Sequence, residues 1–200
     1  MIGTVPVSPL GFGGWAIGGP FSAPDGEPAG WGEVDDAESI SAVRAAFDAG
    51  ITLFDTANVY GTGHSERILA EALAGRRDEV FLASKWGNAM VEETRMLTGS
   101  DGTVSGLRTM LEGSLRRLDT DYLDLFQFHL NDYAGPEVDD LQSELELLAD
   151  QGKIRAYGWS TDFPDQARCW LGGEHYAAVQ TEINVLADNP ELIAIAESNG

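Results

Sequence analysis

The sequence has few cysteines, no long apolar run and no secretory signal. Its 200 residues include one cysteine, Cys169, which excludes an internal disulfide and a cysteine-based metal cluster. Trp170 and Leu171 beside it favour packing over catalysis. No apolar run reaches the roughly 18 residues of a membrane span, and the N-terminus has no basic start followed by an apolar block. We therefore expect no membrane contact and a cytoplasmic location.

Basic residues are also scarce. The sequence has 12 Lys and Arg residues and 33 Asp and Glu residues, which gives a formal charge of −21. Such a surface repels phosphates and argues against a nucleic-acid partner. Only two basic residues are lysines, so Lys85, at the end of an apolar run, draws attention. With 43% hydrophobic and 22% charged residues, the chain is expected to form a single globular domain over 1–200.

Apolar runs of strand length alternate with segments of helical periodicity. Strands are expected over 10–17, 51–55, 80–85, 122–129, 154–159 and 177–183. Helices are expected over 35–49, 65–74, 104–118, 138–151, 165–171 and from 190, with a loop over 88–102. Six such β-then-α units predict an α/β fold with a parallel sheet covered by helices. Periodicity alone leaves a barrel and a doubly wound sheet open.

Polar residues mark the helix ends. Asp35 with Glu38 three residues later resembles a capping box, and Gly50 predicts the end of that helix. Ser65 is expected to cap the next helix, with Glu66 in its first turn.

A glycine-rich segment near the N-terminus resembles a dinucleotide-binding loop. Residues 11–16 (GFGGWA) fit G-x-G-x-x-G/A, and Asp35 or Asp36 lies about 20 residues further on. That motif requires a helix to begin within the glycines. Here a Pro- and Gly-rich stretch follows up to Gly32 and excludes a helix. We therefore reject a Rossmann-type fold.

Polar residues also end the expected strands. They are Asp55, with Tyr60 five residues later, then Lys85, His129, Ser160 and Gln180. Carboxyl ends of parallel strands meet at one mouth, where barrel enzymes place their active sites. Each residue alone has an ordinary structural explanation, such as capping or snorkelling. Their conjunction favours an active site, and Trp86 after Lys85 is expected to line it.

The residue types at this mouth favour chemistry on a carbonyl group. Tyrosine, with a pKa of about 10, is a weak acid at neutral pH. The Lys85 ammonium is expected to lower the Tyr60 pKa, and Asp55 to hold the ammonium. His129 can donate a hydrogen bond to a carbonyl oxygen. The pattern offers no activated serine or cysteine nucleophile and no metal-ligand cluster, so no metal is expected.

Three segments resemble the aldo-keto reductase family. They are GITLFDTANVYGTGHSE (50–66), SLRRLDTDYLDLFQFH (114–129) and GKIRAYGWS (152–160). The resemblance implies a (β/α)8 TIM barrel that reduces small-molecule carbonyl compounds with NADPH. It further implies a catalytic tetrad of Asp55, Tyr60, Lys85 and His129. The implied NADP contacts are Gly14, Trp15, Asp55, Ser160, Thr161 and Gln180.

The sequence departs from the family in two respects. Thr161 follows Ser160 where many members have asparagine, so a hydroxyl replaces an amide. The chain also ends near the sixth helix, so only about the first six βα units of a barrel are expected. We therefore expect a fragment of a longer protein that has two open sheet edges and lacks the family's adenosine-binding loops.

Two other functions remain as alternatives. A barrel aldolase could use Lys85 as a Schiff-base nucleophile, but this needs a neutral amine, and Asp55 would keep it charged. The second alternative is an inactive or interaction-only aldo-keto reductase-like module. It would retain the tetrad and be inactive because the last two βα units of the barrel are missing.

Overall fold

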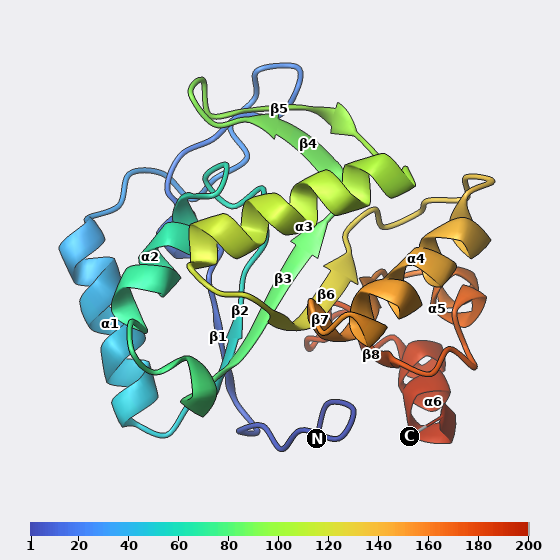
Figure 1. Cartoon of the computed structure of the whole chain (residues 1–200). Helices are drawn as coiled ribbons and strands as arrows, with labels where there is room; N and C mark the ends of the chain where they lie inside the picture. The colour runs from blue at the N-terminus through green and yellow to red at the C-terminus, as the bar shows by residue number, and fades with distance from the viewer. Residues whose placement is uncertain (200) are drawn as a thin grey trace.

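The computed structural model describes residues 1–199, which form a curled parallel sheet with helices outside it (Figure 1). The sheet order is β1-β2-β3-β6-β7-β8, and every neighbouring pair is parallel. Its strands are β1 (Gly11–Gly13), β2 (Leu53–Asp55), β3 (Phe81–Trp86), β6 (Leu123–Phe128), β7 (Ile154–Ser160) and β8 (Tyr176–Gln180). Each strand pairs with the next one along the sheet without a reversal of order. A doubly wound sheet reverses its order, so the fold is an incomplete (β/α)8 barrel of six strands.

The helices cover the outer face of the sheet. They are α1 (Asp36–Asp48), α2 (His64–Ala72), α3 (Val104–Leu118), α4 (Val138–Asp150), α5 (Pro164–Cys169) and α6 (Pro190–Asn199). Two short 3-10 turns, η1 (Ala16–Gly18) and η2 (Arg77–Glu79), lie between these elements. The main core lies between sheet and helices and includes Phe54, Leu82 and Phe126 from strands with Leu69 and Leu111 from helices. Among residues 1–199, no helix is both long and apolar enough to cross a bilayer.

The lumen side of the sheet has a smaller core. Phe81, Ala83, Leu125 and Ala156 form it, and residues of the N-terminal segment pack against them. Because successive side chains of a strand point to opposite faces, this pattern places Lys85 in the lumen. Trp86 points outward instead, is fully buried, and stacks on Phe128 at 4.3 Å between ring centroids. The expectation that Trp86 lines the site is wrong.

The expected strand 10–17 and loop 88–102 are also corrected. Only Gly11–Gly13 forms a strand, because the chain then turns into η1, where Gly18 packs against the backbone of Tyr60. A Cβ at Gly18 would lie 2.7 Å from the Tyr60 carbonyl carbon. The loop forms an antiparallel hairpin, β4 (Asn88–Val91) with β5 (Met96–Ser100), which lies apart from the main sheet near α3 (Figure 1).

The cap of α1 is confirmed and that of α2 is wrong. Asp35 Oδ1 accepts a hydrogen bond from the backbone N–H of Glu38 at 2.9 Å. Helix α2 begins after Gly63, whose φ of 90° favours glycine. Ser65 lies inside the helix, where its hydroxyl donates to the Gly14 carbonyl at 2.7 Å and accepts from Thr56 at 2.8 Å. This serine joins β1 and β2 to the helix and does not cap it.

Cys169 does not pack in the core. It lies at the end of α5 and is exposed, with Sγ 3.3 Å from the Asp165 carbonyl oxygen. Trp170, the next residue, is the one that is fully buried.

Candidate active site

Lys85 is the centre of the polar cluster at the mouth of the sheet. Its side chain is only 1% exposed. The ammonium nitrogen Nζ donates to Asp55 Oδ2 at 2.6 Å and to the Thr56 carbonyl at 2.9 Å. A third, longer hydrogen bond reaches the Tyr60 hydroxyl at 3.4 Å. These three acceptors use all three donors of an ammonium group.

The turn after β2 brings Tyr60 back to this cluster. Asp55 ends β2, and Lys85 lies on the neighbouring strand β3. In the turn after Tyr60, Gly61 has a φ of 60°, and a Cβ on it would lie 1.8 Å from the Gly18 carbonyl oxygen. Only glycine fits this contact, so the sequence Tyr60-Gly61 fixes where the phenol points.

Two interactions position the Tyr60 ring and two opposing effects act on its pKa. Trp15 stacks on the ring at 5.8 Å between centroids and 13° between planes. Lys85 Nζ lies 5.1 Å from the ring centroid. Burial raises the pKa of Tyr60 above 10, and the positive charge of Lys85 opposes this only in part. The expected net lowering of the Tyr60 pKa is therefore wrong, because burial outweighs the lysine.

His129 is held near the phenol as a neutral imidazole. Its ring lies 6.2 Å from the Tyr60 ring, centroid to centroid, at an interplanar angle of 89°. Burial, with a smaller contribution from Lys85, lowers the pKa of His129 to about 3. The ring is uncharged at neutral pH as a result. Its Nδ1 is buried and has no hydrogen-bond partner in the described chain.

Two glutamines extend the cluster into the lumen. Gln180 donates to Asp55 Oδ2 at 3.3 Å and accepts from Gln127 at 2.8 Å. Gln127 was not predicted, although it lies opposite Lys85 in the register of β3 and β6. Gln127 comes two residues after Leu125 of the lumen core, so the period of two along the strand could have indicated a polar side chain on the lumen face.

Gly14 lies against the cluster and Thr161 turns away from it. The Gly14 N–H donates to the Asp55 carbonyl at 2.7 Å, and a Cβ on Gly14 would lie 2.6 Å from Ser65 Oγ. Ser160, at the end of β7, is opposite Gln180 in the sheet. The buried Thr161 hydroxyl donates to the Asn131 carbonyl at 2.6 Å. That hydroxyl is already engaged within the loop, because it also accepts from the Phe163 N–H at 3.0 Å.

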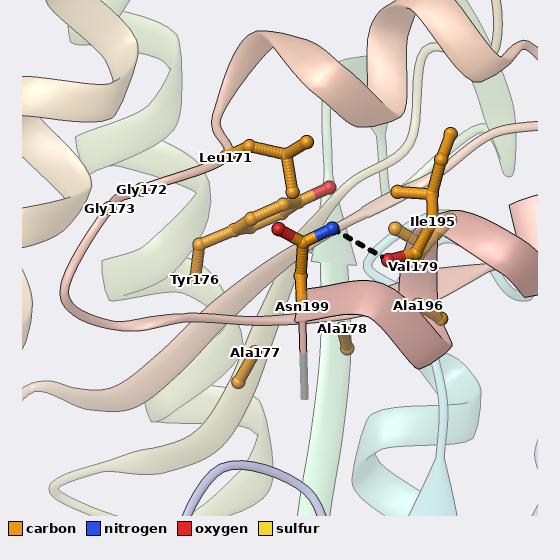
Figure 2. A pocket seen from close by; sticks show the side chains of 10 residues that line it. All are labelled: Leu171, Gly172, Gly173, Tyr176, Ala177, Ala178, Val179, Ile195, Ala196 and Asn199. Carbon is orange, nitrogen blue, oxygen red and sulfur yellow. Dashed lines mark hydrogen bonds between the residues drawn. The ribbon is translucent and has the colours of Figure 1, made fainter.

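A cavity of about 270 Å³ opens beside this cluster. Asp55, Gln127 and Gln180 line its polar side, and Leu53, Ala83 and Leu125 are among its apolar lining residues. A second cavity of about 280 Å³ lies by β8 and α6 (Figure 2). Its lining is mainly apolar and backbone, and the hydroxyl of its one phenol, Tyr176, already donates to the Ala167 carbonyl. Of the polar cluster, only Asp55, Gln127 and Gln180 line the first cavity, and none of its residues lines the second.

Comparisons with known proteins agree with this geometry. The sequence model described as "Aldo/keto reductase family" matches residues 9–200. Aldo-keto reductase YhdN of Bacillus subtilis (strain 168) is 39% identical over 162 residues, which cover 78% of this chain and 44% of YhdN. The holo form of aldo-keto reductase AKR11C1 from Bacillus halodurans superposes with a TM-score of 0.85 at 27% identity. That match covers 100% of this chain and 62% of the other.

A further similar structure includes a cofactor in its name. It is an aldo/keto reductase from Klebsiella pneumoniae in complex with NADP and acetate, with a TM-score of 0.75 and 26% identity. The match covers 99% of this chain and 63% of that one. The chain spans 44–50% of the length of four curated relatives, YhdN among them.

Proposed function

The chain belongs to the aldo/keto reductase family, and from that premise we propose that it reduces aldehydes and ketones to alcohols with NADPH. The observation that carries the proposal is the position of Lys85. Its one ammonium group contacts both the Asp55 carboxylate and the Tyr60 hydroxyl inside a mostly buried site. This arrangement suits a tyrosine that gives up and regains a proton.

Tyr60 is the general acid in this proposal. Because burial keeps its pKa above 10, the phenol is protonated at neutral pH and can donate to a carbonyl oxygen. Loss of the proton leaves a phenolate, which the ammonium of Lys85 stabilises over 3.4 Å. Asp55 fixes Lys85 and balances its charge. Lys85 therefore stabilises the phenolate formed by proton transfer more than the phenol that precedes it.

His129 orients the substrate in this proposal. A neutral imidazole can donate one hydrogen bond to the carbonyl oxygen without competing with Tyr60 as a charged acid. In this proposal His129 and Tyr60 bind the same substrate oxygen, which is supported by the edge-on position of the imidazole 6.2 Å from the phenol ring, centroid to centroid. The alcohol forms when that oxygen takes the Tyr60 proton and the carbonyl carbon takes a hydride.

The residues of the mouth fit a nicotinamide cofactor. Asp55 Oδ1 and Gln127 Oε1 are buried acceptors without partners in the described chain. Buried polar atoms of this kind need donors, such as ribose hydroxyls or a carboxamide. We propose that Asp55, Ser160 and Gln180 hold the nicotinamide end, with Gly14 and Trp15 beside it and Thr161 supporting the loop. When bound, NADPH supplies the hydride.

The two alternatives differ in what they ask of Lys85. An aldolase needs a neutral amine free to attack a carbonyl, and the contacts with Asp55 and Thr56 favour the ammonium. An interaction-only protein needs no proton transfer from Tyr60 at all. Substitution of this tyrosine separates the proposal from the latter.

The test is NADPH oxidation with benzaldehyde by the wild-type chain and two variants. Tyr60→Phe removes only the hydroxyl, and we expect kcat to fall by about 10²–10⁴-fold, as for loss of a general acid. Tyr122→Phe is the matched control, because Tyr122 precedes β6, at the opposite end of the strands from the tetrad. It should keep wild-type activity. Circular dichroism checks that each variant is folded.

A folded wild-type chain that binds NADPH and reduces no aldehyde would favour the interaction-only alternative. Equal activity of Tyr60→Phe and wild type would exclude Tyr60 as the acid. Trapping of an aldehyde on Lys85 by borohydride would support the aldolase instead.

A further inference from the structure

Two asparagines link the loops that carry Tyr60 and His129. Asn58 lies two residues before Tyr60 and is only 1% exposed, and its side-chain Nδ2 donates to the Asn88 carbonyl at 2.9 Å. Asn88 is the first residue of β4, and its own Nδ2 donates to the His129 carbonyl at 3.2 Å. A chain of two amides thus runs from the turn that carries the phenol to the backbone of the histidine.

The hydrogen bonds of the sheet do not hold these two loops against each other. The loops follow β2 and β6, and each of these strands pairs with β3 and not with the other. The side chains of Tyr60 and His129 share no hydrogen bond in the described chain, and their rings are 6.2 Å apart, centroid to centroid. Their relative position therefore depends on what the two loops contact beyond the strand ends.

Both loops attach to the short segment between β3 and β4. The Asn58 N–H donates to the Lys85 carbonyl at 3.3 Å, and the His129 N–H donates to the Trp86 carbonyl at 2.7 Å. The two side-chain amides add a second hydrogen bond to each loop. Two-point attachment removes the freedom to pivot about a single hydrogen bond, so each amide fixes the direction of its loop.

An unsatisfied atom indicates that the donor of Asn58 matters. Its Oδ1 is buried and has no hydrogen-bond partner in the described chain. A buried polar group that is only half satisfied costs stability, and an apolar side chain would avoid that cost. The gain from asparagine here is the N–H that it donates to Asn88. Both links need a donor, because both acceptors are backbone carbonyls, and neither leucine nor aspartate could supply it.

We propose that Asn58 and Asn88 are positioning residues that set the Tyr60 hydroxyl and the His129 imidazole at the separation at which both bind one carbonyl oxygen. This inference rests on the proposed carbonyl reduction. The two asparagines act only through the backbone of the loops and have no part in proton transfer. Catalytic groups lose much of their effect when they are displaced by about an ångström, so loss of a link lowers kcat. The residues proposed to hold the nicotinamide lie outside this chain of amides, so cofactor binding is retained.

The kinetic test is Asn88→Ala with benzaldehyde as the substrate. We expect kcat to fall about 10- to 100-fold, the upper value being that of a misplacement of about 1 Å, while the Kd for NADPH stays within about twofold. Asn88→Gln keeps the donor at this half-buried position and should recover most of the loss. If Asn88→Ala does not fold, Asn88→Leu removes the same donor and fills more of the space.

Gln142→Ala is the matched control. Gln142 is also half-buried, and its Nε2 donates to the Trp170 carbonyl at 3.0 Å, but it lies on α4, outside the sheet. This variant loses a comparable amide donor and should keep the wild-type kcat.

A double variant separates positioning from a general structural effect. The Asn88 side chain reaches the site only through the His129 carbonyl. When Asn88→Ala is added to His129→Gln, we therefore expect kcat to fall by no more than about twofold further, since residues in one network are not additive. A merely structural role of Asn88 would lower kcat by the same factor in both backgrounds.

A spectroscopic test does not depend on turnover. The chain has three histidines, which can be labelled with ¹³C and assigned by single His→Gln variants. Asn88→Ala should shift the ring signals of His129 and leave those of His64 and His175 unchanged. The latter two pair with carboxylates on other elements and serve as internal controls.

The outcomes separate this inference from the proposed function. A shift confined to His129, without reduction by any form, would support the positioning of His129 and contradict the reductase. Reduction that Asn88→Ala leaves unchanged would contradict the inference alone. An equal fall of kcat in the wild-type and His129→Gln backgrounds, or shifts of all three histidine signals, would also overturn it, because Asn88 would then act through the stability of the fold.

Discussion

His129 makes the folded chain sensitive to acid. Burial, with a smaller effect from Lys85, lowers its pKa to about 3, whereas an exposed histidine titrates near 6.5. Between these values the unfolded chain binds a proton that the folded chain refuses. Acid therefore favours unfolding. The contribution of the neutral imidazole is complete above pH 6.5 and is lost as the pH falls toward 3.

Replacing this histidine should remove that sensitivity. Between pH 7 and pH 5 the linkage is worth about 2 kcal/mol. We expect the free energy of unfolding, measured with urea at pH 7 and pH 5, to fall in both proteins as the pH is lowered. The fall should be about 2 kcal/mol larger in the wild type than in His129→Gln. Carboxylates titrate alike in both proteins and cancel in the difference. Identical falls would mean that the imidazole is charged or solvated in the folded state.

The sequence predicted which residues meet at the candidate site more accurately than it predicted the pKa of Tyr60. Asp55, Tyr60 and Lys85 meet as expected, since strand ends of a parallel sheet converge. The direction of the Tyr60 pKa shift could not be read from neighbours alone, because it depends on how deeply the phenol is buried. The sequence pattern did not predict Gln127 as a site residue. It lies at the site because the register between β3 and β6 sets it opposite Lys85.

At the scale of elements, a buried ion pair joins α2, β3 and α3. Glu66, fully buried on α2, accepts hydrogen bonds from Ser84 and from Arg117 Nε, both at 2.6 Å. Ser84 precedes Lys85 on β3, so the same carboxylate anchors the strand that carries the lysine. The prediction that Glu66 lies in the first turn of α2 considered the helix alone and therefore did not include this ion pair.

Removal of Arg117 should therefore be costly. Arg117→Ala leaves the Glu66 carboxylate buried without its cation, and we expect a loss of about 3–5 kcal/mol in urea unfolding. Arg76→Ala is the control: its pair with Asp48 is exposed and it also covers the Phe47 ring, together worth no more than about 1 kcal/mol. Addition of Glu66→Gln to Arg117→Ala should recover part of the loss. Similar costs for the two single arginine variants would contradict a structural ion pair.

The long elements were predictable and the hairpin was not. Helices such as α3 follow a clear period over 15 residues, and the strands of the barrel are apolar runs. The β4–β5 hairpin is only partly buried, so its pattern is weak. Its turn includes Arg95 with a φ of 52°, a conformation that sequence reasoning assigns to glycine or asparagine. The hairpin is fixed partly by its contact with Ser22, far away in the sequence.

At the scale of the whole molecule, the alternation of β and α segments predicted a parallel sheet covered by helices, and the structure confirms it. Alternating β and α segments left two folds open, and the continuous order β1 to β8 decides for the barrel. In the described residues, β1 and β8 each pair with one strand of the sheet. Edge strands of this kind leave backbone groups free for pairing. The cavity beside Asp55 and Gln180 lies along β8, one of these edges.

Net charge gives a last test at this scale. A charge of −21 on 200 residues opposes compaction through self-repulsion. Raising NaCl from about 0.01 M to 0.5 M shortens the screening length from about 30 Å to a few ångströms. We expect the thermal midpoint to rise by at least about 2–4 °C, the shift that about 1 kcal/mol produces in a domain of this size.

Exposed ion pairs such as Arg76–Asp48 weaken in the same salt but are worth little individually. Sucrose at equal osmolality is the control, because it does not screen charge, and its smaller effect should leave the salt increment visible. A midpoint that falls with salt would mean that ion pairs outweigh the repulsion, and the acidic surface would then stabilise the fold rather than strain it.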